Sequence, residues 1–192
     1  MITIEQLIEV FSFHYPYFED EDIKKYLHLF ELKQFKKGDI IVSNKGVCKT
    51  CHFLYSGFVR CYTSEGENEN TLWFGEKGDL ITSFDSLFDD KQGDDIIVAI
   101  TDCTTFSINT AEFKKLTRTN TDFNQFYIKI IEAGYQFWEN RFRILSQLDV
   151  EKRYLEWKGR TKHLEAHVSL GIIAQYLNIN QATLSRLRSK LK

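Results

Sequence analysis

The sequence has no long hydrophobic run, few cysteines and no recognisable leader. None of its apolar stretches approaches the roughly 20 residues that a membrane-spanning helix needs. The start, MITIEQLIEV, is acidic and amphipathic and lacks the charged-then-apolar order of a secretory signal. The four cysteines (Cys48, Cys51, Cys61 and Cys103) are therefore expected to be reduced thiols. Together these absences predict a folded cytoplasmic protein.

Acidic residues are missing from the end of the chain. Between Ala166 and Lys192 there are four basic residues and no aspartate or glutamate. Residues 149–192 contain nine Lys/Arg and four Asp/Glu, a net charge of +5, whereas residues 1–148 contain sixteen and twenty-three, a net charge of −7. Only the C-terminal part is therefore suited to bind a polyanion such as nucleic acid.

Apolar and aromatic residues are abundant, at 43% and 15% of the chain, which is enough to form a real core. From Leu32 to about Ile108 they occur in short extended runs separated by glycines and polar turns. The runs are ELKQF, DIIVS, HFLYS, FVRCYT, TLWFG, DLITSF, DIIVAI and TTFSI. This pattern predicts an α+β fold with an antiparallel β-roll of the jelly-roll type. The aromatics of these runs (Phe53, Tyr55, Tyr62, Trp73, Phe74 and Phe84) are expected to form core, with an apolar effector pocket as the alternative.

Helical periodicity appears on both sides of the strand region. Thr3 and Gln6 form a capping box for a short helix that ends before Pro16, and a second short helix follows it. A further short helix is expected from Thr110. Short helices should therefore flank the roll.

A long helix is predicted from about Phe123 to Leu148. Its apolar residues are too many and too extended for one buried stripe, so we expect the helix to pair with a second copy of itself. The predicted dimer seam consists of Phe123, Tyr127, Ile130, Phe137 and Ile144. The alternative is that the helix only packs on the roll.

Two short helical patterns meet near the C-terminus at the turn Asn178-Ile179-Asn180. Ala174 is small where the helices must cross closely, Asn178 tolerates a left-handed turn, and Asn180 can cap the second helix. This combination predicts a helix-turn-helix whose second helix spans residues 180–191. A helical hairpin that docks another protein is the alternative.

The outward face of this second helix carries side chains that can donate hydrogen bonds to base edges and phosphates. The candidate DNA-binding residues are Gln181, Ala182, Thr183, Ser185, Arg186, Arg188 and Lys190. Their composition and the local positive charge predict binding to duplex DNA.

A β-roll, a long helix and a terminal helix-turn-helix, in that order, resemble the CRP/FNR family of bacterial transcription regulators over essentially the whole chain. The motifs that carry the resemblance are FKKGDII (35–41), LYSGFVRCY (54–62), GDLITSFDSLF (78–88) and LDVEKRYL (148–155), together with the terminal pattern. The resemblance implies a cyclic-nucleotide-binding-like sensor domain at 1–118, a dimerisation helix at 119–148 and a winged-helix-like DNA-binding domain at 149–192. It also implies a homodimer that binds DNA and contacts RNA polymerase.

Alignment to the family implies base contacts by Gln181, Ala182, Ser185 and Arg186. Glutamine suits adenine and arginine suits guanine, whereas Ala182 can offer only an apolar contact such as one to a thymine methyl. Any wing would have to come from residues 156–168, which have poor strand character.

The chain departs from the family where cyclic-nucleotide-binding members hold their ligand. Those members supply a Gly and a Glu for the ribose and an Arg-Ser pair for the phosphate, and the corresponding positions here are Thr82 and Ser83, then Asp94 and Asp95. An aspartate repels a phosphodiester and the bidentate guanidinium contact is lost. We therefore expect an effector other than a cyclic nucleotide, or none.

Histidine is scarce in the predicted strands. Metal enzymes built on β-rolls need several inward histidines and a carboxylate, whereas this region offers only His52. Cys48 and Cys51 have CxxC spacing but no second pair, which is half of a zinc site. We expect no catalytic residue, cofactor or bound metal, and keep a metal- or redox-responsive site at Cys48 and Cys51 as an alternative to ordinary buried or turn cysteines.

Overall fold

The computed structural model describes residues 3–66 and 68–191. Its helices are α1 (Ile4–Phe11), α2 (Asp20–Tyr26), α3 (Phe84–Asp89), α4 (Thr110–Thr119), α5 (Thr121–Gln147), α6 (Val150–Thr161), α7 (Leu170–Tyr176) and α8 (Gln181–Lys190), with short 3₁₀ turns η1 (Leu27–Leu29) and η2 (Lys162–Leu164). Its strands are β1 (Glu31–Phe35), β2 (Ile40–Val42), β3 (Thr50–Ser56), β4 (Val59–Glu65), β5 (Asn68–Gly75), β6 (Leu80–Ile81), β7 (Ile96–Ala99) and β8 (Cys103–Asn109). None of the described helices is both long enough and apolar enough to cross a membrane.

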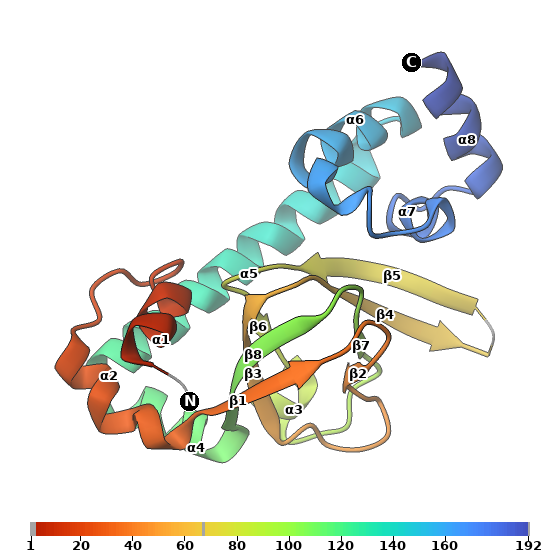
Figure 1. The fold of residues 1–192 in the computed structure, drawn as a ribbon. Coiled ribbons are helices and arrows are strands. Elements are labelled where there is room, and N and C mark those ends of the chain that lie inside the picture. The colour runs from red at the N-terminus through yellow and green to blue at the C-terminus, as the bar shows by residue number, and fades with distance from the viewer. Residues whose placement is uncertain (1–2, 67, 192) are drawn as a thin grey trace.

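The strands form two antiparallel sheets of four strands each, in the orders β1-β8-β3-β6 and β2-β7-β4-β5. The sheets face one another and the β4–β5 hairpin extends from them toward the C-terminal helices (Figure 1). Among the described residues the two sheets do not close into a barrel. The predicted antiparallel strand region is confirmed, and we call it the roll.

Two apolar clusters hold the roll and its flanking helices together. One lies between the sheets and includes Val42, Leu54 and Ile97. The other is aromatic and joins α1 and α5 to the roll: the ring centroid of Phe11 lies 5.0 Å from that of Phe53 and 4.7 Å from that of Phe126. Because aromatic rings bury large areas and pack edge to face, this cluster fixes the N-terminal half of α5 against the roll.

The N-terminal helix has the predicted capping box. The backbone N–H of Gln6 donates to Thr3 Oγ1 over 3.3 Å, and the backbone N–H of Thr3 donates to Gln6 Oε1 over 3.1 Å. Two orphan donors at the start of α1 are satisfied reciprocally, as the spacing indicates.

Two helices were not predicted. The run DLITSF forms a strand only at Leu80–Ile81, because Ser83 then caps α3 by accepting a hydrogen bond from Ser86 N. Residues 150–161 form α6, and η2 follows it. The described part of the segment 149–191 contains no strand and so forms no wing, which agrees with the poor strand character of residues 156–168 that had left the wing open.

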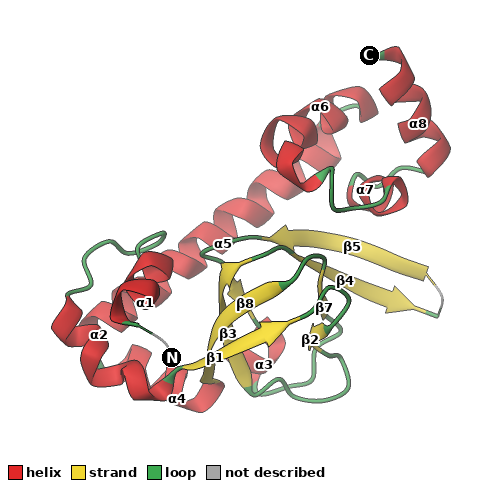
Figure 2. Ribbon diagram, viewed as in Figure 1, coloured by secondary structure: helices red, strands yellow, loops and turns green. Residues whose placement is uncertain are grey.

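Helix α5 leads from the roll to the C-terminal helices. It runs beside α1 and past the sheets, and α6, α7 and α8 cluster at its far end (Figure 2). We call α6–α8 the C-terminal domain. Its own core includes Tyr154, Trp157, Ile173 and Leu184, which are at most 3% exposed.

Candidate nucleic-acid interface

Helices α7 and α8 are joined by a short turn whose residues have the predicted roles. Ser169 caps α7 by accepting a hydrogen bond from Ile172 N, and Asn180 caps α8 by accepting one from Thr183 N over 2.8 Å. Asn178 has a φ of 53°, the left-handed conformation that asparagine tolerates better than most residues. The side chains of the turn residues themselves therefore explain why α7 ends and α8 begins here.

The angle between the two helices is held by small and apolar residues. Ala174 is 2% exposed and its carbonyl accepts a hydrogen bond from Ile179 N over 3.0 Å. Leu184 is fully buried beneath α8. The inward face of α8 is thereby fixed, and its other face points away from the domain core.

The outward face of α8 brings together most of the predicted DNA-binding residues. Gln181, Ala182, Ser185, Arg186 and Lys190 are exposed, whereas Thr183 and Arg188 are half-buried. Arg186 bonds only its own helix through Nε, over 3.4 Å to Ala182 O, which leaves its terminal nitrogens available. Lys190 differs from the others, because its ammonium bonds Glu151 over 3.1 Å.

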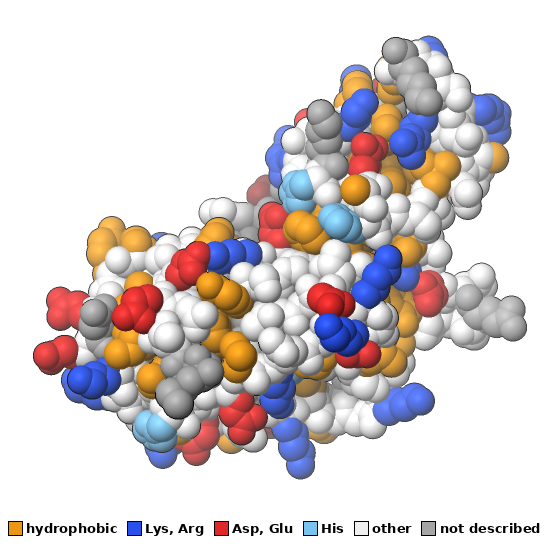
Figure 3. Space-filling view, viewed as in Figure 1, with side chains coloured by type: hydrophobic (Ala, Val, Ile, Leu, Met, Phe, Trp, Pro, Cys, Tyr) orange, Lys and Arg blue, Asp and Glu red, His pale blue; other side chains and the backbone are white. Residues whose placement is uncertain are grey.

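Positive charge on the C-terminal domain is visible at the surface. Lys and Arg side chains are spread over it in Figure 3, whereas the roll shows acidic and basic side chains side by side. An acidic duplex would thus meet complementary charge at this end of the molecule.

The C-terminal domain packs on the β4–β5 hairpin through residues that no sequence motif identifies. Gln175 Oε1 accepts hydrogen bonds from Arg60 Nη2 and Thr71 Oγ1, both over 2.9 Å. Arg60 is 5% exposed and also pairs with Glu69 over 2.7 Å. An arginine inside a strand motif gives no signal of a distant partner, so only the fold could identify this contact.

The four predicted effector-pocket residues do not converge on an open site. Thr82 and Ser83 are 0% and 2% exposed, and Thr82 Oγ1 donates to Thr50 O over 3.1 Å. Asp94 is exposed and Asp95 is half-buried. The two hydroxyls that could hold a sugar already serve the chain's own structure.

Negative charge accumulates beside these hydroxyls. The pKa of Asp95 is raised above its usual value, first by burial and then by the charges of Asp85 and Asp94. Lys91, the cation of this loop, pairs with Asp89 over 3.1 Å. A bound phosphodiester would meet repulsion here and no free cation among the described residues of this loop.

The cysteines and His52 have structural environments. Cys48 Sγ donates to Thr50 O over 3.3 Å, whereas Cys51 is fully buried and its pKa is raised to about 12 by desolvation. His52 Nδ1 lies 2.7 Å from Ser107 Oγ, and burial lowers the pKa of His52 to about 4. No cluster of three or more His, Cys, Asp or Glu that could hold a metal occurs in the described part of the chain.

Helix α5 has two apolar stripes, and the predicted seam lies on the inner one. Phe123 and Ile130 are 0% and 6% exposed within their own chain, and Tyr127 is half-buried against the same cluster. Phe137 and Ile144 line the space between α5 and the C-terminal domain. Phe123 and Ile130 thus cannot contact a partner while this core is intact, which corrects their assignment to a seam.

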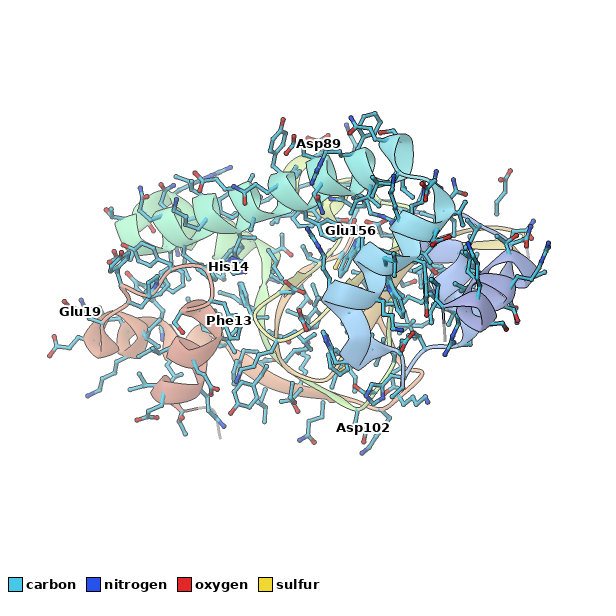
Figure 4. The ribbon with its side chains drawn as sticks, turned by 90° about the horizontal axis from the view of Figure 1, so that it is seen from above. Phe13, His14, Glu19, Asp89, Asp102 and Glu156 are labelled. Carbon is cyan, nitrogen blue, oxygen red and sulfur yellow. The ribbon has the colours of Figure 1, made fainter. Side chains whose placement is uncertain are left out.

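The second stripe lies on the outer side of α5. Its members follow a heptad spacing, namely Ile128, Ile131, Tyr135, Trp138, Phe142 and Leu145. Tyr135 and Phe142 are 72% and 74% exposed, and Ile128 and Trp138 are 39% and 45% exposed. In the view from above, side chains project from α5 away from the rest of the molecule (Figure 4). Ile131 and Leu145 are half-buried, and no described element covers the other four members of the stripe.

Comparison with known proteins gives the same architecture. Residues 32–120 match the family model described as the cyclic nucleotide-binding domain. A CooA mutant from Carboxydothermus hydrogenoformans is 19% identical with a TM-score of 0.71, over 88% of this chain and 82% of that one. The c-di-GMP-responsive global regulator CLP of Xanthomonas campestris is 17% identical with a TM-score of 0.70, over 90% of this chain and 91% of that one.

A transcriptional regulator of the crp/fnr family from Eubacterium rectale gives a TM-score of 0.71 at 17% identity, over 88% of this chain and 82% of that one. No curated protein sequence matches the chain. The chain therefore has the fold of CRP/FNR transcriptional regulators, with a cyclic-nucleotide-binding-type domain at residues 32–120. The resemblance that the sequence motifs indicate is confirmed at the level of the fold.

Proposed function

We propose that the protein is a homodimeric, DNA-binding transcription regulator of the CRP/FNR type and not an enzyme. The observation that carries this proposal is the capped α7–α8 pair, whose second helix exposes Gln181, Ser185 and Arg186 on one face. A helix of this width fits the major groove, where such side chains can reach base edges. The protein would act in the cytoplasm, where bacterial DNA lies.

The proposed roles of the exposed residues follow from their chemistry. Arg186 would bond a guanine in bidentate fashion, Gln181 an adenine, and Ala182 would contact only an apolar group such as a thymine methyl. Arg188 and Lys190, farther along α8, would contact phosphates, which carry affinity and not sequence.

Homodimerisation would use the outer stripe of α5 (Ile128, Ile131, Tyr135, Trp138, Phe142 and Leu145). A heptad repeat of apolar side chains is the pattern that pairs helices in a coiled coil. Burying Tyr135 and Phe142 against a second copy removes two large exposed apolar side chains from water. A two-fold pair of chains would place two α8 helices on successive half-sites of a palindromic duplex.

The effector is proposed not to be cyclic AMP or cyclic GMP. Thr82 and Ser83 are buried and hydrogen-bonded within the chain, and Asp95 lies among other carboxylates. Burying a phosphate anion there without a cation would be costly. The division into sensor domain, dimerisation helix and DNA-binding domain at 1–118, 119–148 and 149–192 stays a prediction, as does contact with RNA polymerase.

The direct test of this proposal is selection of binding sites from a pool of random DNA duplexes by the full chain. We expect enrichment of a palindromic sequence with two half-sites separated by about one helical turn. Enrichment of no sequence by a folded protein would contradict the proposal and favour the protein-docking alternative for α7 and α8.

A further inference from the structure

A cavity lies at the junction of the roll, α5 and the C-terminal domain, apart from Thr82, Ser83, Asp94 and Asp95. Its volume is about 260 Å³ and its walls include Phe74 of β5, Phe137 and Arg141 of α5, Arg153 and Trp157 of α6, and Tyr176 of α7. Pockets for drug-sized ligands have about 300–1,000 Å³, so this cavity suits a smaller molecule. Glu156, labelled in Figure 4, marks the α6 side of its rim.

Arg141 is a buried cation without a carboxylate partner. It is 7% exposed, it donates through Nη2 to Tyr176 O, and its guanidinium lies 3.7 Å from the centroid of the Tyr176 ring. No described carboxylate lies within ion-pair distance of it. Desolvation lowers the pKa of Arg141, and the nearby charge of Arg153 lowers it further. A buried arginine of this kind is stabilised when an anion joins it.

Arg153 adds a second positive charge to the same cavity. Its Nε donates to Leu148 O over 2.9 Å and its Nη1 to Leu177 O over 3.4 Å, so its printed partners are carbonyls. It forms no ion pair with a carboxylate of the described chain. Two guanidinium groups on one cavity, both bonded to backbone carbonyls and neither ion-paired with a described carboxylate, can donate to an oxyanion.

The carboxylates on the cavity wall already have partners. Glu76 Oε2 lies 2.9 Å from His163 Nε2, and Glu156 pairs with Arg160 over 3.6 Å. Asp79 Oδ2 accepts a hydrogen bond from Glu76 N over 2.8 Å. Among the described residues, none of these carboxylates forms an ion pair with Arg141 or Arg153.

Trp157 lies beside these two arginines and has a buried donor without a partner among the described residues. Its side chain lines the cavity, it is 3% exposed, and its indole Nε1 is the buried side-chain donor left without any partner among the described residues. A buried donor without an acceptor costs about 1–3 kcal/mol, so native proteins rarely leave one. An oxygen acceptor is missing at this place.

We propose that this cavity binds a small organic anion, in which a carboxylate or phosphate group accepts hydrogen bonds from Arg141 and Arg153, next to the side chain of Trp157. An apolar part of the same molecule would pack on Phe74 and Phe137. The group needed is an oxyanion, because guanidinium groups are all donors and carry the complementary positive charge.

Such a ligand would contact the roll, the dimerisation helix and the C-terminal domain at once. A ligand stabilises the orientation of the C-terminal domain that it binds most tightly. A ligand in this cavity would therefore favour the orientation seen here over other orientations. The site itself does not depend on DNA binding, so its test can fail while the proposed function stands.

The test is a titration of the ¹⁵N-labelled full chain, followed by NMR at the indole N–H resonances of its three tryptophans. Trp157→Phe assigns the resonance of Trp157. The probes are benzoate and phenyl phosphate, which distinguish a carboxylate from a phosphate, inorganic phosphate, which lacks an apolar part, and benzamide, the uncharged match of benzoate. We expect benzoate or phenyl phosphate to shift the Trp157 resonance saturably, with benzamide and inorganic phosphate weaker.

Matched variants locate the anion. Arg141→Gln should weaken binding by about tenfold or more, because a charge-assisted hydrogen bond is lost. Arg143→Gln removes the same charge two residues away, from an exposed side chain that bonds the cavity residue Asn140 but does not itself line the cavity, and should change binding far less than Arg141→Gln. If Arg141→Gln does not fold, Arg153→Gln takes its place. No saturable shift with either aromatic anion, equal binding of benzamide, or equal losses in the Arg141 or Arg153 variant and in Arg143→Gln would overturn the proposal.

Discussion

The roll and the C-terminal domain use their polar side chains in opposite ways. In the roll, Thr82 and Ser83 are almost fully buried and bonded within the chain. On α8, Gln181, Ser185 and Arg186 are exposed on one face of a helix whose other face is anchored by Leu184. A buried, satisfied hydroxyl has little capacity left for a ligand, whereas an exposed row of donors does. This contrast supports the proposal that α8 carries the recognition chemistry.

The largest expected effect comes from the helix that links the two regions. Phe142→Lys places a charge in the outer stripe of α5 on both copies of a symmetric interface. Loss of apolar burial at two side chains should cost about 3–6 kcal/mol of dimer stability. Sedimentation equilibrium should then show a monomer of 22.7 kDa where the unchanged chain is a dimer.

Phe88→Lys is the matched control, because Phe88 is 54% exposed on α3 and lies outside this stripe. It should leave the dimer intact. A wild-type chain that is monomeric at micromolar concentration would contradict the proposed role of the outer stripe, whatever the variants do.

The next effect concerns the anchor of α8. Leu184→Ala removes a fully buried side chain from the core of the C-terminal domain and should lower its stability by about 2–5 kcal/mol. Leu187→Ala, at a half-buried position of the same helix, should cost less. Urea unfolding, monitored by hydrogen exchange of the amides in α7 and α8, measures the loss of stability in both variants. Equal losses in the two variants would mean that α8 is not packed as described.

The roll and the C-terminal domain differ in how much of their structure can be predicted from the sequence. The α7–α8 turn was predictable because each step has a local cause, such as the left-handed Asn178 and the cap from Asn180. The strands of the roll were predictable from short alternating runs. By contrast, α3 and α6 were not predicted, although each has a local start signal: Ser83 caps α3, and Asp149 Oδ1 accepts a hydrogen bond from Lys152 N at the start of α6.

The choice between the stripes of α5 could not be made from the sequence. Both stripes have apolar residues at heptad spacing, so periodicity alone does not say which one the roll covers. Phe123 was assigned to a partner, but the aromatic cluster around Phe11 buries it in its own chain. The contact between Arg60 and Gln175, 115 residues apart, is likewise visible only in the fold.

A smaller effect is expected at the proposed base contact. Arg186→Ala should cost about 1–3 kcal/mol of binding to the selected duplex and relax the preference at one base pair in each half-site. Arg118→Ala, which removes an exposed arginine of α4 in the sensor region, should change neither affinity nor preference. Competition titrations with single-base variants of the site measure both, and an unchanged preference in Arg186→Ala would remove that residue from the base contacts.

The smallest effect is expected in the roll. Ser83→Ala removes the hydroxyl that caps α3 and should lower stability by about 0.5–2 kcal/mol. DNA affinity should not change, because the hydroxyl serves only the local fold. Thermal unfolding and a DNA titration of the same sample separate the two outcomes, with the exposed Ser64→Ala as the control. A loss of DNA affinity in Ser83→Ala without a loss of stability would show that the roll hydroxyls communicate with α8.

Binding of duplex DNA by the basic C-terminal domain can be measured through its dependence on salt, with the selected duplex as ligand. Each phosphate contacted by a Lys or Arg releases counterions and adds about −0.9 to the slope of log K against log salt. We expect a slope several units negative, made shallower by about one unit in Arg188→Gln. Binding that is absent, or that does not weaken as salt rises, would contradict it.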